Sequence, residues 1–170
     1  GRQEIIKRRQ ESLLISEKKL KIARRAAWLV QSVPFLKAIF VCNTVASEQA
    51  GVDSDIDFFI NTDKNRIWIV RLMVTFILQL SGLRRRKDKI KDKICLSFYV
   101  TEDALDLARF RVVDDDIHFA FWINQMLPLV DPDNYYAKFL QANTWLQTYL
   151  PNINVRSLAS NISLVLLGRV

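Results

Sequence analysis

The sequence predicts a mixed α+β fold: a small mixed β-sheet with flanking helices, followed by a helical C-terminal part. Short apolar runs at residues 37–42, 55–60 and 94–100 indicate three strands, and longer helical patterns precede, separate and follow them. Half of the 170 residues are apolar and a quarter are charged, a composition typical of a folded domain with a core. We divide the chain into N-terminal helices (1–34), a core (35–112) and a C-terminal helical region (113–170).

Residues 3–32 lack glycine and proline and predict helix, with Ser16 as an internal N-cap that divides it in two. An apolar stripe marks the packed side of this helix. The opposite side is basic, which indicates either a solvated face or a nucleic-acid contact; its members are Lys18, Lys19, Lys21, Arg24 and Arg25.

The longest apolar run lies within a helix predicted over residues 66–80, with Gly82 as its C-terminal stop. This run, Ile67 to Leu80, contains Arg71 and falls short of the roughly 20 residues that span a bilayer, so we expect a buried helix and no membrane contact. Two amphipathic helices are predicted over residues 114–130 and 132–149, and a last one over 155–167.

The scarcity of histidine and cysteine excludes several classes of site. His118 is the single histidine and lies in a helical pattern, so a two-histidine zinc site is excluded. Cys42 and Cys95 each sit inside an apolar run, which favours free thiols and a reducing, cytoplasmic setting. The net charge of +7 is expected to attract polyanions. The chain starts at Gly1 and stops just after an apolar run, and we expect it to be a piece of a longer protein.

Asp55 and Asp57 form the most informative pair in the sequence. Two residues apart on a predicted strand, their side chains leave the same face, with Cα atoms roughly 6.5 Å apart. Alternation then places Ile56 and Phe58 on the buried face. Two like charges this close repel unless a cation neutralises them, and Mg²⁺ prefers such oxygen ligands. The pair therefore predicts a metal site, although an isolated Asp-x-Asp pattern is also common in solvated turns.

The context of the pair resembles the nucleotidyltransferase superfamily of DNA polymerase beta-like folds. That motif is an apolar strand, Gly-Ser, a gap of about ten residues and then Asp-x-Asp between apolar residues. Here it reads IFVCNTVA at Ile39–Ala46 and DSDIDFFI at Asp53–Ile60. Residues 1–152 also resemble an uncharacterised group of small prokaryotic members, which share a Pro-Phe pair, a Leu-Arg-Arg-Arg turn and a Lys-Asp-Lys-Ile-Cys-Leu strand.

The resemblance implies a polymerase beta-like sheet on which Asp55 and Asp57 bind metal. It also implies that Thr44, with Asn43 and Ser54, meets the nucleotide. Asn43 stands where the family has glycine, which lets the backbone approach phosphates; asparagine tolerates left-handed geometry better than most residues.

A third carboxylate that the family carries on a later strand is missing. Ser97 is the expected occupant of that position on the strand 94–100, with Cys95 or Tyr99 as less favoured choices. Asp92 and Glu102, at the two ends of the strand, are the acids that would substitute for it.

A basic loop at residues 84–93 holds seven cations in ten residues. We expect either contacts with phosphate or nucleic acid through Arg84, Arg85, Arg86 and Lys93, or a solvated turn balanced by its two acids. Aromatic residues of the C-terminal region occur at helical spacings and are expected to be core rather than base-stacking groups: Trp122, Tyr135, Tyr136, Phe139, Trp145 and Tyr149. Glu48, Asp53 and Asp63 are expected to be solvated.

The favoured hypothesis is a Mg²⁺- or Mn²⁺-dependent enzyme that transfers a nucleoside monophosphate from a nucleoside triphosphate, ATP by preference, to a hydroxyl of a protein, nucleic acid or small molecule. The alternative is a catalytically degenerate nucleotide- or nucleic-acid-binding module with the same fold. A third hypothesis is a scaffold that binds a protein partner through its basic helices. The missing third carboxylate is what separates the first two.

Overall fold

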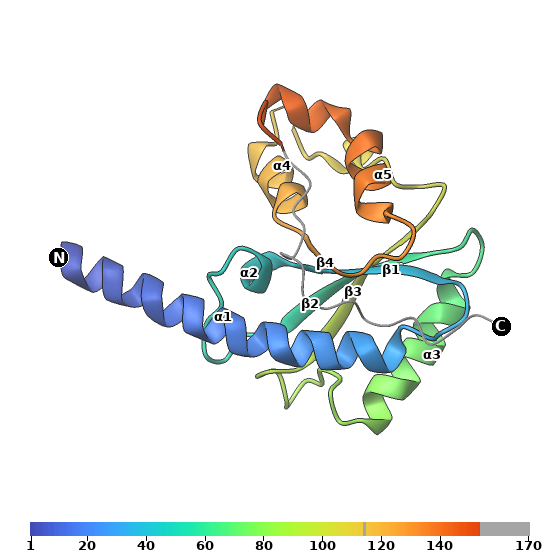
Figure 1. Cartoon of the computed structure of the whole chain (residues 1–170), viewed down its shortest axis with the longest axis horizontal. Helices are drawn as coiled ribbons and strands as arrows, with labels where there is room; N and C mark the ends of the chain where they lie inside the picture. Colours follow the sequence, from blue (N-terminus) through green and yellow to red (C-terminus); the bar gives the residue numbers. More distant parts are fainter. Residues whose placement is uncertain (114, 154–170) are drawn as a thin grey trace.

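The computed structural model describes residues 1–113 and 115–153, and it has the mixed α+β architecture that the sequence predicts (Figure 1). Its elements, in chain order, are α1 (Arg2–Val30), β1 (Leu36–Cys42), α2 (Asn43–Ala46), β2 (Ile56–Thr62), α3 (Ile67–Leu80), β3 (Ile94–Thr101), η1 (Ala108–Phe110), α4 (Ile117–Asn124), β4 (Leu127–Val130), α5 (Tyr135–Ala142) and η2 (Thr144–Thr148).

The strands form one mixed sheet in the order β3-β2-β1-β4. β1 pairs antiparallel with both β2 and β4, whereas β2 pairs parallel with β3 through the connection that contains α3. The predicted mixed sheet is therefore confirmed. The first residues of β2 lie between the last residue of β1 and the first residues of β3.

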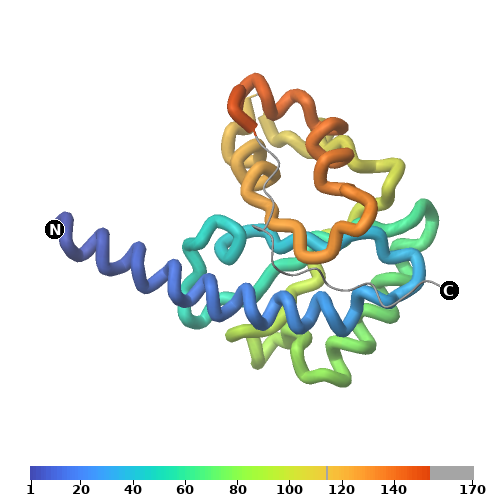
Figure 2. Tube along the Cα trace, viewed as in Figure 1, coloured from blue at the N-terminus to red at the C-terminus, as the bar shows by residue number. Residues whose placement is uncertain are grey.

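Helices cover both faces of the sheet (Figure 1). α1 and α3 lie on one face, where the core includes Val41, Ile56, Phe58 and Ile94. α4 and α5 cover the other face, and there Phe40 and Phe59 are among the core residues, with most of the predicted aromatic cluster packed around them. The interpretation of those aromatics as core is confirmed. The tube view shows the first turns of α1 projecting beyond the sheet (Figure 2).

α1 is a single continuous helix, so the predicted division at Ser16 is wrong. Ser16 is buried, and its hydroxyl oxygen accepts a hydrogen bond from the backbone N–H of Ala50 at 3.1 Å, so it joins the helix to the loop before β2. Lys19 lies on the buried side of α1, not on the predicted basic face. Its side chain is 1% exposed, and its ammonium group donates to the carbonyl oxygen of Ser54 at 2.7 Å and to the carboxylate of Asp92 at 2.6 Å.

α3 has the predicted position, and Gly82 ends it with φ 66° in the left-handed region. The helix is not buried all round, in contrast to our expectation. Val70, Val74 and Leu78 face the core, but a stripe on the opposite side is exposed: Trp68, Leu72, Phe76 and Leu80. No helix in the described part of the chain has the length and apolar character needed to cross a bilayer.

The helix predicted over residues 114–130 is partly wrong, because α4 ends at Asn124 and the chain then forms β4. An unbroken apolar run fits a buried helix and a strand equally well by periodicity. Pro128 lies within β4, a position that an edge strand tolerates because one of its sides needs no ladder hydrogen bonds. The second predicted helix shortens to α5 plus η2, and the one predicted over 155–167 lies outside the described residues.

The buried contact of Lys19 yields a first prediction. Lys19→Met keeps the aliphatic stem but removes the ammonium donor from the carboxylate of Asp92 and from the carbonyl of Ser54, which still accepts from the backbone N–H of Asp92 at 3.3 Å. We expect the free energy of unfolding to fall by about 2 kcal/mol, measured by urea denaturation. The matched change at exposed Lys18, Lys18→Met, should alter it by less than about 0.5 kcal/mol. Equal midpoints for the two variants would contradict the structural role of Lys19.

Candidate metal centre

The two aspartates sit at the start of β2, between its two neighbouring strands. Asp57 lies opposite Cys42 of β1 on one side and opposite Cys95 of β3 on the other, so these three side chains share a face. Asp55 comes one residue before β2 rather than within it, a small correction to the predicted strand. The predicted alternation is confirmed, because Ile56 and Phe58 point into the core on the opposite face.

The third group beside the aspartates is a thiol. Asp55, Asp57 and Cys95 each offer one ligand atom, and these atoms lie within 4.8 Å of one another. The ladder between β2 and β3 shifts register after the Asp57–Cys95 pair, and Ser97 falls within this irregularity. Ser97 is exposed, and its hydroxyl lies 2.8 Å from the sulfur of Cys95. The serine thus supports the thiol, and the thiol occupies the position beside the aspartates.

Asn43 holds the second aspartate from the β1 side. Its side-chain N–H donates to a carboxylate oxygen of Asp57 at 2.8 Å, and its side-chain oxygen accepts a hydrogen bond from the indole N–H of Trp122 on α4. Asn43 has φ 58°, a left-handed conformation that glycine adopts freely and asparagine tolerates. The asparagine therefore keeps the backbone geometry that glycine would allow, and it adds a fixed link from α4 to the carboxylate.

Arg85 of the basic loop neutralises the first aspartate. Its guanidinium donates to a carboxylate oxygen of Asp55 at 2.7 Å and to the sulfur of Cys95 at 3.6 Å. The Asp55 side chain is 17% exposed and that of Arg85 is 43% exposed, so the pair lies at the rim of the site. Ion pairs with that much solvent access contribute about 1 kcal/mol or less, and a divalent cation competes with them readily.

The other predicted nucleotide contacts lie around this centre with different partners. Thr44 is exposed in the short helix α2, and its carbonyl oxygen accepts from the backbone N–H of Gln49 at 2.8 Å. The Ser54 hydroxyl donates to the carbonyl of Gly51 at 3.0 Å, so it stabilises the turn before Asp55. Lys93 donates to the carbonyl of Gly82 at 2.7 Å.

The remaining acids near the motif are engaged elsewhere. Asp92, the first substitute for the missing carboxylate, pairs with Lys19. Glu102, the second, accepts from the hydroxyl of Tyr135 at 3.1 Å and from the backbone N–H of Lys64. The three acids expected to be solvated form ion pairs at the surface: Glu48 with Arg9, Asp53 with Lys91 and Asp63 with Lys37.

Both cysteines are free, as predicted, and both are kept as neutral thiols. Burial raises the pKa of Cys95, with a hydrogen bond to Asp57 acting in the same direction and the contacts with Ser97 and Arg85 opposing it. Burial raises the pKa of Cys42 well above its usual value, and the charge of Asp57 adds to this. A bound cation would favour the thiolate of Cys95, which is the one of the two that lies in the cluster.

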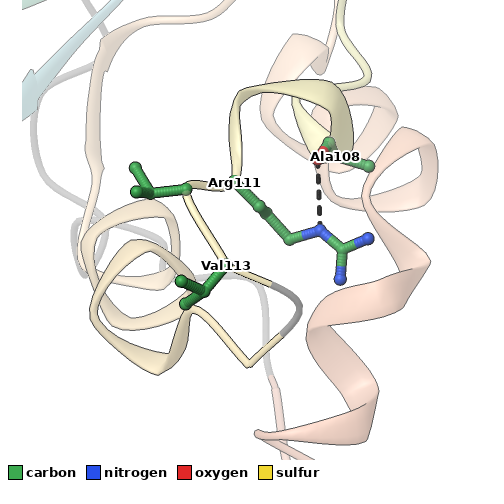
Figure 3. A pocket seen from close by; sticks show the side chains of 4 residues that line it. Ala108, Arg111 and Val113 are labelled. Atoms are coloured by element: carbon green, nitrogen blue, oxygen red, sulfur yellow. Dashed lines mark hydrogen bonds between the residues drawn. The ribbon is translucent and has the colours of Figure 1, made fainter.

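Two hollows in the described part of the chain differ in their relation to this centre. The larger, about 500 Å³, lies at η1 and the segment after it and is lined by Ala108, Arg111, Val112 and Val113, with Arg111 donating to the carbonyl of Ala108 at 3.1 Å (Figure 3). Among the residues that the structure describes, no acid or thiol lines it. The other, about 470 Å³, is open and lies over the basic loop and β3, with Arg85, Cys95 and Ser97 in its wall. The second one adjoins the aspartates.

Comparisons with protein-family models, with curated proteins and with solved structures find no match for this chain. The resemblance to nucleotidyltransferases therefore depends on the sequence motif. The motif located Asp55, Asp57 and Asn43, which the structure brings together. It did not identify Trp122 as a partner of Asn43, because an indole at helical spacing in an apolar helix has the pattern of a core residue.

The role of Asn43 yields a second prediction. Asn43→Gly keeps the left-handed backbone but removes the hydrogen bonds to Asp57 and Trp122. Asn43→Ala removes the same hydrogen bonds and keeps a Cβ in a left-handed conformation, which costs alanine, unlike glycine, about 1 kcal/mol. We therefore expect the free energy of unfolding to decrease in the order wild type, Asn43→Gly, Asn43→Ala, with a total loss of about 2 kcal/mol for alanine. Urea denaturation measures it. An alanine variant as stable as the glycine variant would contradict the assigned geometry.

Proposed function

We propose that the chain is a divalent-cation-dependent nucleotidyltransferase that moves a nucleoside monophosphate from a nucleoside triphosphate to a hydroxyl acceptor. One observation carries this proposal: the ligand atoms of Asp55, Asp57 and Cys95 lie within 4.8 Å of one another on one face of the sheet. The left-handed Asn43 at the end of β1, where the motif has glycine, supports the same assignment.

The donor set fits a divalent cation. Two carboxylates supply the hard oxygen ligands that Mg²⁺ and Mn²⁺ prefer, and the thiol adds a softer ligand that Mn²⁺ accepts better than Mg²⁺. A cation bound there would neutralise charge on the phosphates and orient them for in-line transfer. The chain's own contribution is to hold the two carboxylates in place, Asp57 through Asn43, and to keep cationic groups beside them, with Arg85 nearest.

The alternative, a module that binds nucleotide or nucleic acid without catalysis, is favoured by two features of the same site. The third group is Cys95 and not a carboxylate. Because the pKa of its thiol is raised, the thiol is less able than an ionised carboxylate to accept a proton from an acceptor hydroxyl. In addition, Arg85 pairs with Asp55, which supplies positive charge where a cation would bind.

The wider proposal completes the assignment. We propose ATP as the nucleotide, a protein, nucleic acid or small molecule as the acceptor, and the cytoplasm as the compartment. The free cysteines and the net charge of +7 support the compartment and the anionic ligands respectively.

The carboxylates yield a third prediction. With Mn²⁺ and each nucleoside triphosphate in turn, we expect the wild-type protein to release pyrophosphate and to label itself or an added acceptor. Asp57→Asn preserves the shape of the side chain and keeps one acceptor oxygen for Asn43 while removing a charged ligand, and should lower the pyrophosphate release rate at least about 100-fold. A coupled pyrophosphate assay measures it.

A charge-matched control separates the site from general electrostatics. Asp53→Asn removes one exposed negative charge from the same segment and should leave the rate unchanged, since the Asp53 side chain is 89% exposed and pairs with Lys91 at the surface. Metal-dependent thermal stabilisation without pyrophosphate release would favour the non-catalytic module. Equal release by the wild type and Asp57→Asn would overturn the enzyme assignment.

A further inference from the structure

The open hollow beside the aspartates has a strongly basic lining. Among its described lining residues are five cationic side chains and no acid: Arg71, Arg84, Arg85, Arg86 and Lys87. The remaining lining residues are the apolar or weakly polar groups of β3 and the loop, namely Ile90, Ile94, Cys95, Leu96 and Ser97. Five like charges around one concave surface repel each other and concentrate a positive potential there, which is relieved most directly by an anion with several oxygens.

The cations of this hollow come from two separate elements. Arg71 projects from α3, where it lies 5.2 Å over the ring of Tyr99 and is held against the sheet. Arg84 and Arg86 belong to the loop. A backbone bridge joins Arg84 to Ile94 of β3, and another joins Arg86 to Lys89 within the loop. The backbone of the loop is therefore anchored at these two points, while the side chains of residues 85–90 are exposed.

A second, smaller hollow continues from the first. Its volume is about 170 Å³, and its lining includes Arg84 and Arg86 again, with Lys89 and Lys93 added. Arginine binds phosphate oxygens in a bidentate manner, and the two hollows share Arg84 and Arg86.

Arg85 links the basic hollow to the metal centre. Its guanidinium lines the hollow and also donates to Asp55 and Cys95. A cation that takes Asp55 as a ligand displaces Arg85, and Arg85 then turns into a hollow that already contains four other positive charges. An anion in the hollow removes that repulsion and gives Arg85 a new partner.

We propose that the basic hollow is a binding site for phosphate groups, and that Arg85 couples its occupation to divalent-cation binding at Asp55 and Asp57. The anion draws Arg85 away from Asp55 and frees the carboxylate for the cation. Because binding linkage is reciprocal, the cation raises the affinity for the anion by the same factor. The proposed coupling depends on the proposed metal centre, whereas the proposed anion site depends only on the lining of the hollow.

The two halves are tested separately. Sulfate serves as the first probe because it is a tetrahedral dianion that barely chelates Mn²⁺, and chloride keeps the ionic strength equal in the reference sample. Without metal, sulfate should raise the melting temperature of the wild type, and Arg84→Gln should weaken sulfate binding about fivefold to tenfold. The control is Arg109→Gln, which removes the same charge from an exposed arginine on η1 and should bind sulfate as tightly as the wild type does. Equal sulfate affinity in the two variants would overturn the anion site.

The coupling is then read by calorimetric titration of Mn²⁺ with and without saturating sulfate. We expect sulfate to tighten Mn²⁺ binding to the wild type about threefold to fivefold, the range for releasing one exposed ion pair. Arg85→Gln should bind Mn²⁺ more tightly without sulfate and show no further gain when sulfate is added. Tight Mn²⁺ binding that sulfate leaves unchanged in the wild type would overturn the coupling. Absence of Mn²⁺ binding in Arg85→Gln would remove the metal centre while the anion site still stands on the sulfate result.

The source of the phosphate is settled by two further probes, both used without metal. A single-stranded RNA 12-mer that binds the wild type more tightly than ATP, and that loses this advantage in Arg84→Gln, identifies a nucleic-acid backbone as the ligand. ATP that binds at least as tightly as the 12-mer, with the same loss in Arg84→Gln, identifies a nucleotide. Binding of both probes unaffected by Arg84→Gln contradicts the site.

Discussion

Mutual repulsion of two carboxylates is the constraint on which the site is built. Asp55 and Asp57 leave the same face at the start of β2, so each has to be balanced by its surroundings. Arg85 supplies a positive charge to one, and Asn43 supplies a hydrogen bond to the other. Neither partner is deeply buried, and both contacts come from segments outside β2. The carboxylates are thereby held close together in a form that a divalent cation can enter.

The sheet determines which groups meet at this point. Because β2 lies between β1 and β3, its first residues are flanked by the end of one strand and the beginning of the other, and Cys42, Asp57 and Cys95 share one row. The antiparallel pairing with β1 brings Asn43 to the carboxylates, and the parallel pairing with β3 brings Cys95 together with the basic loop before it. A chemically mixed site with an acidic centre and a basic side follows directly from this strand order.

Much of this arrangement is predictable from sequence, and the exceptions have physical reasons. The three apolar runs gave the positions of β1, β2 and β3, and alternation placed Asp57 opposite the core. β4 was missed because an apolar run of Leu127–Val130 next to α4 has the same pattern as a buried helix turn. Lys19 was misplaced because a helical pattern assigns lysine to solvent, whereas its partners, Ser54 and Asp92, are distant in sequence. The pairing of Cys95 with Asp57 depends on the parallel register between β2 and β3, which local sequence does not reveal.

The central claim is that the Asp55–Asp57–Cys95 group binds a divalent cation, and anomalous diffraction tests it most directly. Crystals grown with MnCl₂ should show a manganese peak about 2.1 to 2.4 Å from the carboxylate oxygens of Asp55 and Asp57, with Arg85 moved away from Asp55. A map without anomalous density at this position, and with Arg85 still bonded to Asp55 at millimolar manganese, would contradict the account.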